Sequence, residues 1–139
     1  MAILAIDFGE RRIGLAASDP SDTMAFPLQT LERTNREDDA RRIAEAARER
    51  GIRDVVIGMP LTLRGERGPA AQKVEAFAEL VRSALPEAAI HFVDERMTTA
   101  EVTKTLIAAD VSRKQRKRVV DGMAAALILQ TYLARAKRP

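Results

Sequence analysis

Three acidic residues stand at places in the chain where a carboxylate can take part in chemistry. Asp7 follows an apolar run over residues 2–6 that has the length of a buried strand, and Gly9 comes two residues later. A glycine there lets backbone or ligand approach closely, because it has no Cβ atom. Glu95 follows a second apolar run, and Asp121 stands at the start of an alanine-rich helical segment. We therefore expect three carboxylates at the ends of separate elements.

Carboxylates that gather at one edge of a fold repel one another unless they are protonated or bind cations. Mg²⁺ and Mn²⁺ are hard cations that accept sites made only of oxygen. Two such ions, about 4 Å apart, activate a water molecule and stabilise the leaving oxygen in phosphodiester cleavage. The sequence has no cysteine and one histidine, His91, which excludes a thiolate site and a multi-histidine site within one chain. Ordinary Ser-His-Asp or Cys-His chemistry is excluded too, unless His91 is its base.

The periodicity of apolar residues predicts the elements that position these carboxylates. Residues 2–7 and 13–18 read as two strands, which are antiparallel because their link is short. A third strand is expected over residues 24–31, where Pro27 favours an edge position or a bulge. Further strands are expected over 54–58 and 89–93, and helices over 36–50, 70–85, 98–109 and 117–136. The apolar side of the last helix is expected to carry Val120, Met123, Leu127, Gln130, Thr131 and Ala134.

This order predicts an α/β fold: an antiparallel meander followed by parallel strands, forming a five-stranded mixed sheet with helices on both faces. If the strands that carry Asp7 and Glu95 run parallel near the sheet centre, their C-terminal ends share the edge where open α/β sheets bind ligands. The last helix can pack across the same edge, because Ala124 and Ala125 lie one turn after Asp121. A single domain over residues 1–139 is expected.

The net charge of +3 is unevenly distributed along the chain. Residues 1–95 have 13 Lys and Arg against 17 Asp and Glu, whereas residues 96–139 have 10 against 3. The segment 112–118 contains five basic residues in seven. Clustered Lys and Arg attract phosphate backbones at long range, which favours a polyanionic partner. A solvated basic tail explains the same charge, so charge alone decides little.

Four sequence motifs follow one another along the chain: Asp7-Phe8-Gly9 with Arg12-Ile13-Gly14, Gly58-Met59-Pro60-Leu61 with Gly65, Asp94-Glu95-Arg96-Met97-Thr98-Thr99, and Val120-Asp121 with Ala124-Ala125 and Ile128-Leu129-Gln130. Together they resemble the YqgF/RuvX family of the RNase H-like superfamily, over nearly the whole chain. The resemblance implies an RNase H-like fold and a nuclease acting on structured nucleic acid. It also implies that Asp7, Glu95 and Asp121 are catalytic carboxylates that bind Mg²⁺ or Mn²⁺.

Cations near these segments are expected to hold the phosphates of a nucleic acid: Arg12, Arg64, Arg96, Arg113, Lys114, Arg116, Lys117 and Arg118. Arg12 is as well suited to pair with a carboxylate as to bind phosphate. Asp94 competes with Glu95, because adjacent residues of an extended backbone point opposite ways and only one faces the metals readily. The family motif selects Glu95. His91 is expected to be a strand residue.

The resemblance leaves the substrate open. Family members are described either as processing the 5′ end of pre-16S ribosomal RNA, which we prefer here, or as resolving Holliday junctions in DNA recombination and repair. A resolvase is expected to act as a homodimer, because two strands must be cut symmetrically. A nucleic-acid-binding factor without catalysis is a third interpretation, which depends on the basic segment. An ATP-dependent phosphotransferase of the sugar-kinase and actin class also begins with Asp-x-Gly, but 139 residues leave no room for its second domain.

The sequence also bears on location. The N-terminus lacks a basic region followed by a long apolar one, since Asp7 interrupts the candidate. No stretch approaches the roughly 18 apolar residues that a membrane span needs. A soluble, cytoplasmic protein without a membrane partner is expected.

Overall fold

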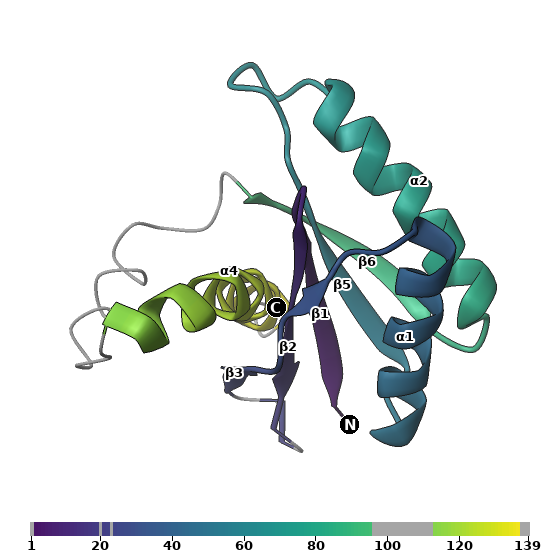
Figure 1. Ribbon diagram of the computed structural model, residues 1–139, viewed down its shortest axis with the longest axis vertical. Helices are drawn as coiled ribbons and strands as arrows, with labels where there is room; N and C mark the ends of the chain where they lie inside the picture. The colour runs from purple at the N-terminus through teal and green to yellow at the C-terminus, as the bar shows by residue number, and fades with distance from the viewer. Residues whose placement is uncertain (1, 20, 23, 96–112, 137–139) are drawn as a thin grey trace.

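A mixed sheet of six strands forms the centre of the computed structural model (Figure 1). In chain order the strands are β1 (Ile3–Phe8), β2 (Arg12–Ser18), β3 (Ala25–Pro27), β4 (Leu31–Glu32), β5 (Asp54–Met59) and β6 (Ala89–Asp94). They lie in the order β3-β2-β1-β5-β6, with β4 also paired to β2. β1 is antiparallel to β2 and parallel to β5, which is parallel to β6. The predicted meander and parallel strands are confirmed, with β1 central and β6 outermost.

The structure describes residues 2–19, 21–22, 24–95 and 113–136, and it describes residues 113–121 and 136 by their backbone only. The helix predicted over residues 98–109 lies outside these residues. No helix in the described part of the chain is long and apolar enough to cross a membrane.

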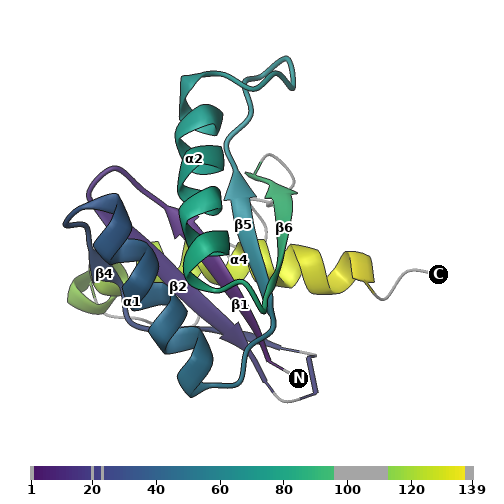
Figure 2. The same cartoon turned by 90° about the vertical axis from the view of Figure 1, so that its right-hand side faces the viewer.

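Helices cover both faces of the sheet, as predicted. α1 (Arg36–Glu49) and α2 (Pro69–Ala84) lie on one face, and α4 (Arg113–Ala136) crosses the other (Figures 1 and 2). Successive side chains of a strand point alternately to the two helix layers. Leu4 and Ile6 of β1 are buried with α1 and α2, whereas Ile3 and Ala5 are buried with α4. Since side chains alternate along a strand, the odd-numbered positions of β1 face α4.

The third predicted strand is divided into two. β3 pairs with residues 16–18 of β2, and β4 pairs with Arg12 and Ile13. The two registers differ by one residue, so an extra residue is accommodated between Pro27 and Leu31. Pro27 lies in β3, at the edge of the sheet. The edge position of Pro27 is therefore confirmed, and the extra residue lies after Leu28, which still bonds to Leu15 in the register of β3. The single strand over 24–31 and the count of five strands are corrected.

The last helix differs from its prediction at its start and in its buried side. α4 begins at Arg113, and not near residue 117, because Lys, Arg and Gln are good helix formers. Its buried side differs from the predicted stripe. The buried residues are small or aliphatic: Ala125, Ala126, Ile128, Leu129 and Leu133. A Cβ atom on Gly122 would lie 2.9 Å from Cβ of Pro27. The small residues let α4 approach the sheet, and that approach selects the buried side.

Candidate functional site

Asp7 and Glu95 lie at the C-terminal edge of the parallel strands, on the face that α4 covers. Asp7 continues the alternation of Ile3 and Ala5 in β1, and Glu95 comes two residues after Val93, which is buried on the same face. β1, β5 and β6 run in the same direction, so their C-terminal ends share one edge. This is the edge at which open α/β sheets bind ligands.

The two carboxyl groups are in contact. Burial raises the pKa of Glu95 to about 7, together with the charge of Asp7, a hydrogen bond between the side chains of Glu95 and Asp7, and the charge of Asp94. Among the described residues, the charged neighbours that raise this pKa are the acidic Asp7 and Asp94, so the site favours a proton or another cation between its carboxylates. A hard divalent cation fits such a set of oxygen atoms.

Gly58 of β5 provides the space in which Glu95 lies. A Cβ atom at this position would come within 2.7 Å of Oε1 of Glu95 and 2.5 Å of Cδ1 of Ile128 in α4. Any other residue would therefore displace the carboxylate, the helix, or both. The sequence marked Gly58 as part of a motif, but not as a residue that positions Glu95.

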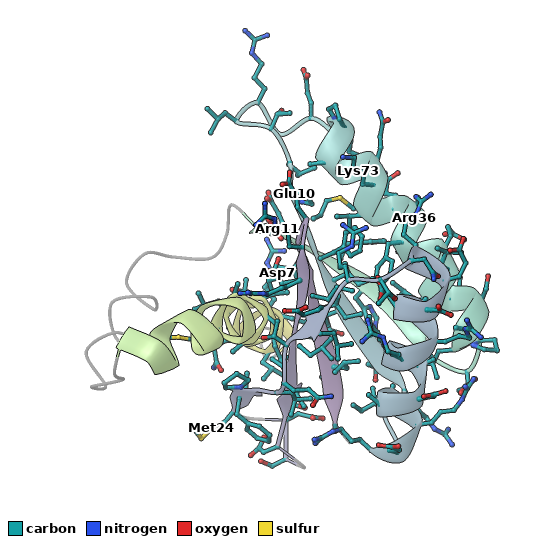
Figure 3. All side chains as sticks on the ribbon, in the orientation of Figure 1. Asp7, Glu10, Arg11, Met24, Arg36 and Lys73 are labelled. Carbon is teal, nitrogen blue, oxygen red and sulfur yellow. The ribbon has the colours of Figure 1, made fainter. Side chains whose placement is uncertain are left out.

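The turn after Asp7 is held by a residue that the sequence analysis missed. The guanidinium of Arg33 lies over the ring of Phe8, 4.3 Å from its centroid, and donates to the carbonyls of Gly9 and Glu10 at 3.1 and 3.0 Å. Phe8 also stacks on Phe77 of α2. Figure 3 shows Asp7 just below Glu10 and Arg11 of this turn. Arg33 thus fixes the end of β1 that carries Asp7.

Gly9 allows close approach, as the sequence predicts, but its neighbour is the chain itself. Its amide donates to the carbonyl of Arg12 at 3.0 Å, and a Cβ atom would come within 2.6 Å of that oxygen. A side chain at Gly9 would therefore open the β1–β2 turn. Gly9 therefore stabilises the turn and does not itself form a ligand site. The candidate ligand site lies at the neighbouring carboxylates.

Asp94 and Asp121 complete the acidic candidates. The charge of Asp94 acts on Glu95, so the competitor that the sequence placed beside Glu95 is part of the same electrostatic environment. Position 121 lies in α4, one helical turn before the buried Ala125. The side chain of Asp121 lies outside the described residues. Among the side chains that are described, no three Asp, Glu, His or Cys residues form a group that could hold a metal ion.

The predicted phosphate-binding cations fall into two groups. Arg12 and Arg64 are described and exposed, and Nε of Arg12 lies 4.0 Å from Oε1 of Glu32. Of the two roles that the sequence left open for Arg12, pairing with a carboxylate is therefore the one seen in the structure. Arg96 lies outside the described residues, and the basic segment 113–118 is described only as the first part of α4.

His91 is a strand residue of β6, as predicted, and it lies away from the carboxylates. Its Nε2 lies 3.1 Å from Oδ1 of Asp54, the first residue of β5, and its ring lies 5.3 Å from that of Tyr132. This cluster lies toward the opposite end of the parallel strands. Its geometry gives His91 no role beside Glu95.

Comparison with solved structures defines the fold. The chain is similar to Thermus thermophilus RuvC in complex with a Holliday junction, with a TM-score of 0.62 and 18% identity over 99% of this chain and 96% of that chain. It is also similar to the Fowlpox virus resolvase in a complex with Holliday junction DNA, with a TM-score of 0.60 and 9% identity over 99% of this chain and all of the other. At these identities the likeness shows the fold, and the predicted RNase H-like fold is confirmed.

The sequence defines the family. Residues 1–135 match the RuvX family, which is described as "Holliday junction resolvase". A relative from Desulforudis audaxviator, named "Putative pre-16S rRNA nuclease", is 47% identical over 96% of this chain and 94% of its own length. The chain therefore belongs to the RuvX family, and the predicted class of enzyme, a nuclease, is confirmed.

Proposed function

We propose that this protein is a metal-dependent endonuclease that processes the 5′ end of pre-16S ribosomal RNA. The observation that carries the proposal is the contact between Asp7 and Glu95 at the C-terminal edge of parallel strands. The name of the relative from Desulforudis audaxviator supports the choice of RNA. The proposal includes a cytoplasmic location, where that RNA would be processed.

In the proposed site, Mg²⁺ or Mn²⁺ would be held by Asp7, Glu95 and Asp121. A pair of such ions, when bound, activates a water molecule and stabilises the leaving oxygen of a phosphodiester. The chain itself prepares the ligands. Glu95 holds a proton below a pH of about 7 and loses it above, which leaves two carboxylates at the edge of the sheet. Arg33 holds the turn beside Asp7, and Gly58 keeps the space that Glu95 occupies.

In the proposed function, basic residues near the site bind the phosphates of the nucleic acid. Arg64 lies on the loop after β5, and 113–118 is the first part of the helix that crosses the face of the site. Together with Arg12 and Arg96 they would bind phosphates on both sides of the cleaved bond. If about five phosphates are neutralised, the logarithm of the binding constant should fall with the logarithm of salt concentration, with a slope of about −4.5 on duplex DNA.

The test is cleavage of a precursor ribosomal RNA in Mn²⁺, with chelator as the blank. Asp7→Asn, Glu95→Gln and Asp121→Asn should each lower the rate by at least about a thousandfold and leave most of the RNA affinity. Asp54→Asn is the matched control, because Asp54 lies at the opposite end of β5 and should leave the rate unchanged. Retained turnover in all three site variants would refute the proposal.

A Holliday junction resolvase is the second candidate, favoured by the family description that matches residues 1–135. It is distinguished by offering a four-way DNA junction in the same assay. Symmetric cuts in the junction by a homodimer, with the RNA left intact, would select the resolvase. Binding of either substrate without metal-dependent cleavage would select a non-catalytic factor.

A further inference from the structure

The loop between β5 and α2 presents an unusually exposed apolar side chain. Leu63 is 98% exposed, whereas the next most exposed large apolar residue in the described part of the chain, Met24, is 66% exposed. The loop projects beyond the end of β5, at the same edge of the sheet as Asp7 (Figures 1 and 3). The loop thus belongs to the edge of the sheet at which the carboxylates lie.

The loop is a built turn. The amide of Gly65 donates to the carbonyl of Thr62 at 2.8 Å, which makes Leu63 and Arg64 the two corners of a four-residue turn. The amide of Thr62 donates to the carbonyl of Glu66 at 2.9 Å, and the amide of Glu66 donates to Oγ1 of Thr62 at 3.1 Å. Gly65 has a φ of 80°, a conformation that favours glycine. The turn thus holds both corners outward.

The base of the loop is attached to the body of the protein on both sides. Leu61 packs against the core that α1 and α2 share. Nη1 of Arg67 lies 2.8 Å from Oε1 of Glu75 in α2. An anchored loop with an apolar corner and a cationic corner can press the first against a ligand without losing its own structure.

We propose that Leu63 is a wedge that inserts between stacked bases of the nucleic acid bound at the carboxylate edge, with Arg64 on the adjoining phosphate. The inference rests on the proposed nuclease function. Proteins that bend or open nucleic acids insert leucine and similar apolar side chains between base steps and thereby unstack them. An aliphatic wedge suits a chain with only five aromatic residues, which offers few stacking platforms.

A second copy of the chain fits this corner poorly. The flanking Arg64, Glu66 and Arg67 are all exposed, so within its own loop Leu63 is surrounded by charged residues. A stable protein interface buries at least about 1,000 Å² with an apolar centre. A single leucine among charges offers the opposite: one apolar point with cations beside it.

The test measures base unstacking directly. A stem–loop RNA and a four-way DNA junction carry 2-aminopurine at the base step next to the branch, and Ca²⁺ replaces Mg²⁺ to limit cleavage. Wild-type protein should raise the fluorescence. Leu63→Ser should abolish the rise and weaken binding by roughly tenfold, because burial of a leucine is worth at least one power of ten in an equilibrium constant. Leu63→Met, the matched control, should preserve the rise.

The outcomes are distinct. An unchanged rise in Leu63→Ser, or no rise with wild-type protein on a substrate that it cleaves in Mn²⁺, would overturn the wedge and leave the nuclease proposal standing. Loss of self-association in Leu63→Ser by sedimentation, with fluorescence unchanged, would assign the leucine to a second copy. A wild-type protein that binds neither substrate would overturn both proposals. Leu63→Ser should keep its melting temperature, because an exposed side chain adds little to stability.

Discussion

Two carboxyl groups that the fold shields from water, those of Asp39 and Glu95, have pKa values that are shifted in opposite directions. The side chain of Asp39 is fully buried in α1 and pairs with Arg42. Burial raises the pKa of Asp39, but hydrogen bonds from Arg42 and Thr34 outweigh it, so the pKa lies below its ordinary value. At Glu95 burial acts in the same direction, but the neighbouring charges that act with it belong to Asp7 and Asp94, and the pKa rises to about 7.

The difference separates a structural carboxylate from a candidate ligand. The chain supplies its own cation to Asp39, and Thr34 donates to the same oxygen through its amide and its hydroxyl, both at 3.1 Å. At Glu95 the chain places acidic groups together at an edge of the sheet, where a cation from solution would lower the energy of both carboxylates. Burial of an acidic residue alone therefore does not distinguish a candidate ligand from a structural carboxylate. The charge of the neighbouring groups makes the distinction.

Removing the buried carboxylate should give the largest effect on folding. Asp39→Ala removes the acceptor of three hydrogen bonds, two from Thr34 and one from Arg42. We expect a loss of about 3 kcal/mol in the free energy of unfolding, since each such bond contributes about 1 kcal/mol. Urea denaturation measures the loss. Asp38→Ala, at a half-exposed neighbour in the same helix, should lose less than about 1 kcal/mol. Equal losses would remove the structural role assigned to Asp39.

A methyl group at Gly58 should act on both fold and site. Its Cβ atom would overlap Glu95 and Ile128, and we expect Gly58→Ala to cost about 2 kcal/mol in stability. Because Glu95 must move, the variant should also lose Mn²⁺ affinity and cleavage at temperatures where it is folded. Circular dichroism separates the two effects. Full activity in the folded variant would contradict the positioning role of Gly58.

The two carboxylates should give the stability opposite dependences on pH. The folded pKa of Glu95 is raised from 4.5, so its contribution is fully present below that value and is lost as pH rises through about 7. The folded pKa of Asp39 is lowered from 3.8, so its contribution is present above that value and is lost as pH falls through the folded pKa. In chelator, Glu95→Gln should flatten the fall in melting temperature between pH 5 and pH 8, by a few degrees. An identical fall in wild type and variant would show that Glu95 titrates normally.

Much of this arrangement follows from local patterns in the sequence. The apolar run before Asp7 predicted β1, the short link predicted its antiparallel partner, and the helical period predicted α1 and α2. The edge shared by Asp7 and Glu95 followed from parallel strands joined by helices. These features depend on neighbouring residues and on general rules of chain topology, so periodicity suffices.

The rest depends on contacts between residues far apart in the chain. Arg33 reaches the carbonyl of Gly9 across 24 positions, and nothing in its local sequence distinguishes it from other arginines. Gly58 meets Glu95 and Ile128 only after three elements have packed together. The buried side of α4 was assigned wrongly because it is set by the close approach of Gly122 to Pro27, two residues that lie far apart in the chain.

Metal binding by the Asp7–Glu95 pair is the central claim, and titration calorimetry with Mn²⁺ tests it most directly. Wild-type protein should bind Mn²⁺ more tightly at pH 8 than at pH 6, and at pH 6 it should release protons that appear as a buffer-dependent heat, because the ion displaces the proton of Glu95. Asp7→Asn and Glu95→Gln should weaken binding by at least about tenfold, and Glu87→Gln, at an exposed carboxylate, should not. Equal Mn²⁺ affinity in all four proteins would contradict the account.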